Sequence, residues 1–278
     1  MPDFPLSDGA TTSSTLGGDL ATSSGTIITA SATPNTKGAY TELLSSTTAP
    51  IGGFSVAIQG EELTAPTDFL LDISVGGAGS EEVIVPDLLF SIGNSMDTGL
   101  LLTFEIPVSI PQGIRIAARM QASAASEAIA CSIIAKATTF SSSGTGASMI
   151  AVGANTADSG GTQVDPGGTI NTKGSYTEIT ASLGRTINGI LLATGQQTNT
   201  ANRRNKFLID IAIGGSGSEE IIVSNYPMTA TQQETTFLGR AVIPITIPVG
   251  TRISIRCQSA DADSTDRLLD YVIYGVVI

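Results

Sequence analysis

The sequence predicts an all-β protein made of two tandem, duplicated antiparallel β-sandwich domains of jelly-roll-like type, preceded by an N-terminal arm. One observation behind this prediction is that several blocks of the first half return in the second half. Another is that short apolar stretches alternate with clusters of Gly, Pro, Ser, Thr and Asn about every 8–12 residues. No long stretch carries apolar residues at the three- and four-residue spacing of an amphipathic helix.

The central repeat is residues 69–85, which return as residues 207–223 with twelve of seventeen positions identical. Each copy begins and ends with β-branched and other apolar residues, which suit a pleated, buried surface. The glycines between them permit the positive φ angles that a tight connection needs. We therefore expect strand, glycine-rich hairpin turn and strand in each copy.

Two further pairs establish the duplication. Residues 35–42 match 171–178 at an offset of 136, and residues 106–121 match 243–258 at an offset of 137. The central block has an offset of 138, so the three blocks keep their order with insertions of one or two residues. This regularity excludes chance similarity.

The predicted domains follow from the repeat, because each copy has the size of a single domain with its own core. A stretch rich in Ser, Thr and Gly separates the copies and has the composition of a linker. The expected units are an N-terminal arm at 1–24, sandwich one at 25–137, a linker at 138–150 and sandwich two at 151–278.

The arm is rich in Ser, Thr, Gly and Ala and is expected to order only against another surface. Its segment Thr15-Leu16-Gly17 nevertheless aligns with Ala151-Val152-Gly153 at the offset of 136. This alignment leaves open that the arm adds a strand to domain one.

Composition excludes several classes of function. The net charge of −12 and pI near 4.3 argue against a nucleic-acid partner, which requires a basic surface. No apolar run approaches the roughly 20 residues of a membrane-spanning helix, and no secretory signal is recognised at the N-terminus. The absence of histidine removes Ser-His-Asp and Cys-His nucleophilic sites and histidine-ligated zinc. We expect no membrane partner, no cofactor and no enzymatic activity.

The two cysteines do not correspond between the copies. Cys257 aligns with Met120, whereas Cys131 falls near Leu268. A framework disulfide would recur in both copies, so we interpret both residues as buried free thiols made in a reducing cytosol.

Recurring carboxylates are the main candidates for chemistry. Asp72, Glu81 and Glu82 return in the second copy, and acids across a hairpin can act as acid and base or hold a cation. The favoured interpretation is a solvated turn whose acids meet Arg115 and Arg252 or protect a sheet edge.

A weak metal candidate lies in the loop with Asp261, Asp263 and Asp266, which resembles the opening of a calcium loop. The loop lacks the sixth-position glycine and the twelfth-position glutamate of that motif. A loop tip without metal is therefore the preferred interpretation.

The loops before the central block differ in charge between the copies and supply candidates for a subunit contact. The acidic set is Glu61, Glu62 and Asp68, and the basic set is Arg203, Arg204 and Lys206. Opposite charges suggest a head-to-tail contact between neighbouring subunits, and independent drift of two solvated loops is the alternative.

The motif Asp-Ile-x-x-Gly-Gly-x-Gly-Ser-Glu-Glu-x-Ile-Val, together with Ile-Pro-x-x-Ile-Pro-x-Gly-x-Arg-Ile, resembles structural proteins of tailed-bacteriophage virions. The resemblance covers residues 25–136 and 161–278 and implies β-sandwich modules of decoration, fibre or collar type. It also implies no catalysis, assembly on symmetric particles and folding in a bacterial cytoplasm.

The sequence thus favours a non-enzymatic structural protein of a bacteriophage particle, on the capsid surface, a head fibre, the collar or the tail. Its expected partners are other virion proteins and further copies of itself, as a trimer or another symmetric homo-oligomer. The alternative is a receptor- or glycan-binding adhesion module, although the chain has no tryptophan for stacking on sugars and Tyr40 and Tyr176 suggest a shared packing role. A glycan-cleaving enzyme that uses carboxylates is a third possibility.

Overall fold

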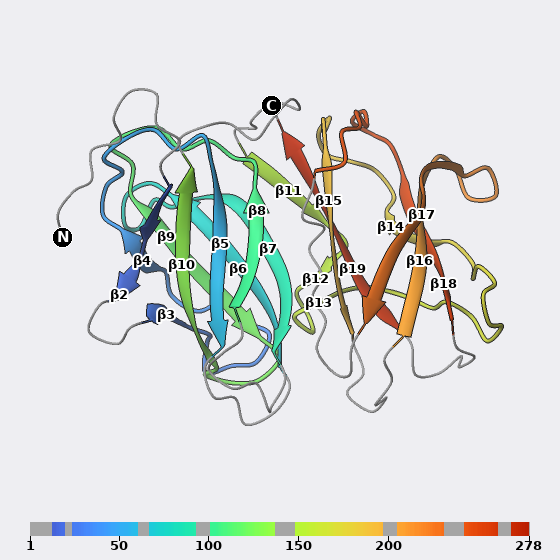
Figure 1. The fold of residues 1–278 in the computed structure, drawn as a ribbon, viewed down its shortest axis with the longest axis horizontal. Coiled ribbons are helices and arrows are strands. Elements are labelled where there is room, and N and C mark those ends of the chain that lie inside the picture. The colour runs from blue at the N-terminus through green and yellow to red at the C-terminus, as the bar shows by residue number, and fades with distance from the viewer. Residues whose placement is uncertain are drawn as a thin grey trace.

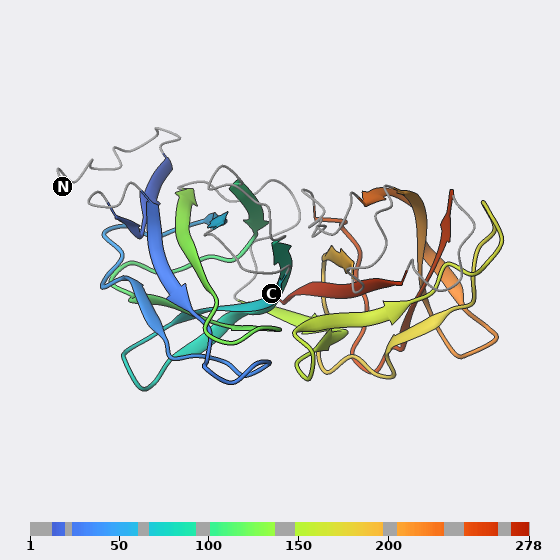
Figure 2. The same cartoon turned by 90° about the horizontal axis from the view of Figure 1, so that it is seen from below.

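A computed structural model describes residues 13–19, 24–60, 67–92, 101–136, 148–196, 205–230, 242–260 and 268–277. These residues form two antiparallel β-sandwiches that lie side by side along the long axis of the molecule (Figures 1 and 2). The described residues include no helix, which confirms the prediction of an all-β chain with two duplicated sandwiches. Among them, accordingly, no helical segment has the length and apolarity that crossing a lipid bilayer requires.

The first sandwich consists of two antiparallel sheets. One has the order β2 (Gly18–Asp19), β3 (Ser24–Thr29), β10 (Ala128–Lys136), β5 (Gly53–Gly60) and β8 (Leu101–Ile106), with β1 (Ser13–Leu16) also paired to β10. The other has the order β4 (Thr41–Leu44), β9 (Ile116–Ala122), β6 (Thr67–Val75) and β7 (Glu82–Ile92).

The second sandwich repeats this arrangement. One sheet joins β12 (Ala154–Asn155), β13 (Gly160–Val164), β19 (Leu269–Val277) and β11 (Ser148–Val152), with β15 (Ile190–Gln196) also on β19. The other sheet has the order β14 (Thr177–Thr180), β18 (Ile253–Ser259), β16 (Asn205–Ile213) and β17 (Glu220–Ala230). The strand order corresponds to that of the first sandwich except at β8. Among the described residues, an isolated bridge between Ile190 and Ile243 takes the place of the pairing of β5 with β8.

The strands bear on two boundaries of the sequence-based division. β1 lies within the stretch assigned to the arm, residues 1–24, and pairs with β10, so the arm adds a strand to the first sandwich, as the alignment of residues 15–17 left open. β11 begins at Ser148, inside the stretch 138–150 assigned to the linker, because its residues pair with β19. Residues 1–12 and 137–147 lie outside the described residues.

The central repeats form the predicted hairpins. Val75 pairs with Glu82 across the first turn, and Ile213 pairs with Glu220 across the second. Gly76 and Gly214 have φ values of 105° and 103°, a backbone region that residues with a side chain rarely enter.

The register of the sheets aligns the two copies residue by residue. Leu16 pairs with Ile133 in the first sandwich, and Val152 pairs with Ile273 in the second, so β10 and β19 correspond at an offset of 140. Cys131 is therefore equivalent to Tyr271, and the alignment with Leu268 expected from sequence was wrong by three residues. The earlier alignment failed because β10 and β19 share few identical residues.

Both cysteines are free and buried, which confirms their interpretation as buried thiols. Burial raises the pKa of the Cys131 thiol and of the Cys257 thiol to about 12. Both groups therefore stay protonated and unreactive near neutral pH.

The strand β19 is buried on both faces, from Leu269 to Val276. Its equivalent β10 carries half-buried residues at Ser132 and Ile134. One face of β19 packs in the core of the second sandwich, whereas Val272, Tyr274 and Val276 belong to a core cluster centred on the first sandwich. The two sandwiches are therefore joined by a shared apolar core.

Candidate functional site

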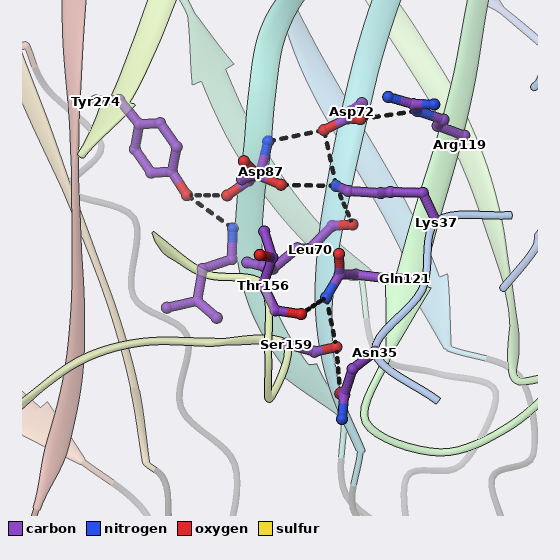
Figure 3. A network of polar contacts seen from close by, with 11 residues as sticks. Asn35, Lys37, Leu70, Asp72, Asp87, Arg119, Gln121, Thr156, Ser159 and Tyr274 are labelled. Carbon is purple, nitrogen blue, oxygen red and sulfur yellow. Dashed lines mark hydrogen bonds and ion pairs between the residues drawn. The ribbon is translucent and has the colours of Figure 1, made fainter. Parts of the chain in front are cut away.

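A buried carboxylate organises the outer face of the β4-β9-β6-β7 sheet. Asp72 on β6 is 3% exposed and accepts hydrogen bonds from Lys37 Nζ at 2.8 Å, Arg119 Nε at 2.9 Å and the amide of Asp87 at 2.9 Å. Lys37 also pairs with the Asp87 carboxylate at 2.7 Å, and the Arg119 guanidinium lies 4.5 Å from the centre of the Tyr40 ring. The recurring residues Lys37, Tyr40, Asp72 and Arg119 thus form one structural cluster. Figure 3 shows Lys37 and Arg119 around Asp72.

The second sandwich contains the same cluster around Asp210. Lys173 Nζ lies 2.8 Å and Arg256 Nε 2.9 Å from its carboxylate, and Arg256 lies over the Tyr176 ring at 4.6 Å. Burial raises the pKa of Asp210, but the Lys173 ammonium and the Asn225 amide outweigh that effect and hold the pKa below its usual value.

In both clusters the arginine lies over a tyrosine ring, so Tyr40 and Tyr176 serve as stacking platforms for arginine.

The acids of the hairpin also have structural partners. Arg115 bonds to Glu42 at 2.8 Å and to Glu81 at 3.1 Å, and Arg252 repeats both contacts in the second sandwich. Glu82 is exposed at the end of the hairpin. Glu81 and its counterpart Glu219 brace the hairpins through Arg115 and Arg252, as the favoured interpretation had it. Asp72 differs from that interpretation, because it is buried and pairs with Lys37 and Arg119.

The main contact between the sandwiches is formed by one sheet face of the second sandwich. β11 and β15 pack on the edge strand β7 of the first sandwich, beside β19. Leu191, Val272, Tyr274 and Val276 contribute to the shared core from this face. We call this packing the interdomain contact.

Tyr274 connects the interdomain contact to the backbone of β7. Its hydroxyl donates to the carbonyl oxygen of Asp87 at 2.6 Å and accepts from the amide of Leu89 at 2.8 Å. This satisfies two polar groups on the free edge of β7, which would otherwise be buried without partners. Asp87 in turn bonds to Asp72, so Figure 3 shows a continuous network from the ionic cluster to the second sandwich.

The turn between β12 and β13 makes the second part of the interdomain contact. Gln121 Nε2 donates to the carbonyl oxygen of Thr156 at 2.9 Å and to Ser159 Oγ at 3.0 Å, and Ser159 Oγ donates to Asn35 Oδ1 at 2.8 Å (Figure 3). Gln121 is 2% exposed and Ser159 fully buried. We call the surface around Asn35 and Gln121 the first docking site.

The sheet face that enters the interdomain contact is apolar in the second sandwich, and the equivalent face of the first sandwich is more polar. In the first sandwich, Ser55, Glu105 and Lys136 form a polar group in which Ser55 Oγ donates to Glu105 at 2.8 Å and Lys136 forms an ion pair with Glu105. The register places Leu191, Val242 and Val276 at the same positions of the second sandwich. The apolar set packs against the first sandwich, so the copies have diverged where one is covered and the other is not.

Acidic side chains gather at the border of the interdomain contact. Burial raises the pKa of Asp68 on β6 to about 6, and the negative charge of Asp158 adds to the shift. Burial likewise raises the pKa of Asp270 on β19 to about 7, with Asp68 and Asp158 contributing further. Asp270 is 1% exposed and its Oδ1 atom has no hydrogen-bond partner, so its ionised form is costly.

This arrangement predicts a specific dependence of stability on pH. An aspartate whose folded pKa exceeds its unfolded value near 3.8 stabilises the fold at low pH, and this stability is lost as pH rises toward 7. Asp270→Asn stays neutral, so it should raise the melting temperature by roughly 5 °C at pH 8 and leave it nearly unchanged at pH 4. Calorimetry at both pH values measures this difference, with Glu82→Gln as the exposed control. An equal effect of Asp270→Asn at both pH values would contradict it.

The structure describes only some of the candidate site residues. Asp68 lies in β6 and Lys206 in β16, so both belong to strands rather than to the loops in which the sequence placed them. Asp68 is used within the chain, where its carboxylate accepts a hydrogen bond from Ser91 at 2.6 Å. The remaining candidates fall outside the described residues, namely Glu61, Glu62, Arg203, Arg204, Asp261, Asp263 and Asp266. Within the described part, no three acidic, cysteine or histidine side chains gather to hold a metal ion.

Sequence reasoning missed the interdomain contact, which is formed by Asn35, Gln121, Ser159 and Tyr274. Asn35 and Gln121 recur as Asn171 and Gln258. Because the residue types are the same in both copies, the sequence does not indicate that Asn35 and Gln121 contact the other sandwich. One signal in the sequence could have indicated the contact: positions 191, 242 and 276 are apolar where the first copy has polar residues. This difference can be recognised only once the register of β10 and β19 is known.

No protein-family model and no curated protein sequence matches the chain. Among solved structures, the CBM22-1-CBM22-2 tandem domain of Paenibacillus barcinonensis Xyn10C is 11% identical with a TM-score of 0.27, covering 85% of this chain and 82% of that one. PNGF-II is 10% identical with a TM-score of 0.38, covering 96% and 65%. The infectious bursal disease virus Gt strain is 10% identical with a TM-score of 0.23, covering 100% and 79%. Such values support no inference about function.

Proposed function

We propose that the chain is a non-enzymatic structural protein of a bacteriophage particle, which acts through protein–protein contacts on the surface of the head, collar or tail. The observation that carries this proposal is the interdomain contact. It joins one module to the side of the next through an apolar sheet face, a tyrosine that caps a strand edge and a buried turn. A module that packs on its own repeat in this way is suited to building extended or symmetric surfaces.

The recurring charged residues support a structural role. The two aspartates at the centre of the repeats are held by lysine, arginine and backbone amides, and the hairpin glutamates are held by arginine. In both copies these groups brace strands and turns. Their duplication is explained by the duplicated fold, which needs the same cluster twice.

Immunogold electron microscopy tests the particle assignment. An antibody against the purified chain should label particles from a lysate of the bacterial host that produces it, at a regular position on head, collar or tail. Particles from a phage that lacks the gene provide the control. Labelling that stays in the soluble fraction and never marks particles would contradict the assignment.

A second candidate function, ligand binding, is favoured by one feature of the second sandwich. A cavity of about 320 Å³ lies beside β16 and β17, with Phe207, Pro227 and Met228 as apolar lining and Asn171, Lys206 and Gln258 as polar lining. A glycan array with the purified chain and with Gln258→Ala separates this function from the first. Glycan binding that Gln258→Ala abolishes would support an adhesion module.

A further inference from the structure

The interdomain contact joins two different surfaces, and duplication gives each sandwich both of them. The second sandwich contributes its β11-β19-β15 sheet face, and the first contributes β7 with the first docking site. Two equivalent surfaces are therefore left over. One is the β1-β10-β5 face of the first sandwich, and the other is β17 with its neighbouring cavity on the second sandwich.

The cavity beside β17 occupies the position of the first docking site. Strand register and the 136-residue repeat offset make Asn171 equivalent to Asn35 and Gln258 equivalent to Gln121. In the first sandwich these two side chains are bonded to the turn that carries Ser159. In the second sandwich the same pair lines a cavity of about 320 Å³, with Asn171 exposed and Gln258 half-buried. We call this surface the second docking site.

β17 exposes the apolar residues that its equivalent buries. Ile84 and Leu89 of β7 are almost fully buried, whereas Ile222 is half-buried and Pro227 is exposed. Ile221, the neighbour of Ile222, is 43% exposed, and its equivalent Val83 is half-buried. This edge strand therefore carries an apolar surface that the interdomain contact covers on β7.

Compensating differences link the two remaining surfaces. Within the chain, the Tyr274 hydroxyl meets the amide of Leu89. By register, Ile134 replaces Tyr274 and Pro227 replaces Leu89. A proline has no amide hydrogen and an isoleucine has no hydroxyl, so a contact between these two leaves no amide or hydroxyl unpaired. The carbonyl of Asn225, equivalent to the Asp87 carbonyl that Tyr274 satisfies, receives no hydrogen bond from Ile134.

The face around Ile134 has room for such a partner. A depression of about 230 Å³ lies there, lined by Thr15, Ala57, Gln59, Ser132 and Ile134 among others. The chain has four residues between β2 and β3, as it has between β12 and β13, and Ser23 aligns with Ser159 in sequence; residues 20–23 lie outside the described residues. The first sandwich thus keeps the segment length and the aligned serine of the surface that docks within the chain, whereas Ser55, Glu105 and Lys136 replace its apolar set.

The charges also differ in the direction that favours a contact between chains. Burial raises the pKa of Asp68 and of Asp270 at the first docking site, and the negative charge of Asp158 raises both further. In the second docking site Lys206 takes the place of Asp68, and Ala130 takes the place of Asp270. The acidic repulsion of the interdomain contact is therefore absent from this pair of surfaces.

We propose that the β1-β10-β5 face of one chain docks on β17 and the second docking site of another copy, repeating the interdomain contact head to tail. This proposal deepens the proposed structural function by naming a second copy as the partner and the surfaces it uses. Such a heterologous contact forms a closed ring or a filament, and in a ring of three chains six similar modules would follow one another. Because Ser55, Glu105 and Lys136 replace an apolar set, the contact between chains is weaker than the one within a chain.

Cross-linking of two singly substituted chains tests this contact. Ile134→Cys and Pro227→Cys are prepared separately, mixed at high concentration and treated with a short bifunctional maleimide. Because the native Cys131 and Cys257 are buried thiols, the introduced cysteines are the reactive ones. The mixture should yield a cross-linked dimer at least about tenfold above either protein alone, since one surface of each kind is needed.

Val249→Cys provides the matched control, because Val249 is 59% exposed and belongs to neither surface. A mixture of Pro227→Cys with Val249→Cys should give only the background yield. Cross-linking of either singly substituted protein with itself, at the yield of the mixture, would overturn the head-to-tail geometry. Background yield in all mixtures would overturn the contact itself.

Light scattering of the unmodified chain supplies the second measurement. Its mass should rise above 28.3 kDa with concentration, and Ile134→Glu should weaken this association at least about tenfold by placing a charge against apolar residues. A constant mass of 28.3 kDa at every concentration, together with background cross-linking, would overturn the proposal. Particle labelling without cross-linking would support the structural function and contradict this contact. Cross-linking without particle labelling would support the contact and contradict the structural function.

Discussion

Replacing Asp72 by alanine is expected to lower the free energy of unfolding by about 3–5 kcal/mol. The substitution removes the acceptor of Lys37, Arg119 and the Asp87 amide at once. It leaves a lysine whose side chain is 17% exposed with a single carboxylate partner, Asp87. Urea denaturation measures the loss, and a decrease below about 1 kcal/mol would contradict the central role of this carboxylate.

Asp210→Ala is the matched variant, because the same cluster exists in the second sandwich. Only Asp72 is connected through Asp87 to Tyr274 and hence to the interdomain contact. Hydrogen exchange should therefore become faster in both β7 and β19 for Asp72→Ala. Asp210→Ala should affect its own sandwich and leave the amide of Leu89 protected.

Tyr274→Ala is expected to destabilise the protein by about 3–5 kcal/mol, the range for removing a fully buried aromatic side chain. Tyr274 is 0% exposed and belongs to the core cluster shared by the two sandwiches. Its loss leaves a cavity there and removes the partner of the β7 edge. Scanning calorimetry should show the single unfolding transition separating into two, one for each sandwich.

Two further variants make this result specific. Tyr274→Phe keeps the ring and removes the hydroxyl, so about 1–3 kcal/mol should be lost from the unpaired Leu89 amide and Asp87 carbonyl. Ile134→Ala alters the equivalent position on the half-buried face of the first sandwich and should cost about 1 kcal/mol or less. An equal effect of Ile134→Ala and Tyr274→Ala would show that the interdomain contact contributes little.

The repeat made the fold predictable from sequence because both copies keep the residues that build it. Residues 69–85 and 207–223 carry a strand, a turn with glycines at positive φ and a second strand, and each of these features follows from residue type. The ionic clusters were visible only as recurring residues. Their grouping around Asp72 depends on the pairing of β6 with β9, which brings residues 47 positions apart into contact.

The interdomain contact was not predictable from the repeats, because identity between copies identifies what they share and the contact depends on how they differ. Leu191 and Val276 read as ordinary strand residues until the sheet register sets them against Ser55 and Lys136. That register could not be derived from sequence, since β10 and β19 were aligned three residues apart. Asp68 and Lys206 were selected for their charge, and the strands β6 and β16 that carry them began earlier than expected.

The pairing of β10 and β19 has a consequence for how the chain folds during translation. Strands β1, β3 and β5 all pair with β10, and β11, β13 and β15 all pair with β19, the last of these strands to be synthesised in each sandwich. In each sandwich, three earlier strands therefore keep the edge that will meet β10 or β19 unpaired as the polypeptide leaves the ribosome, and that edge is open to incorrect pairing. The first sandwich can close once Lys136 has emerged, and its β7 then offers a finished surface. Because β19 also carries Tyr274, completion of the second sandwich and its attachment to the first become the same late event.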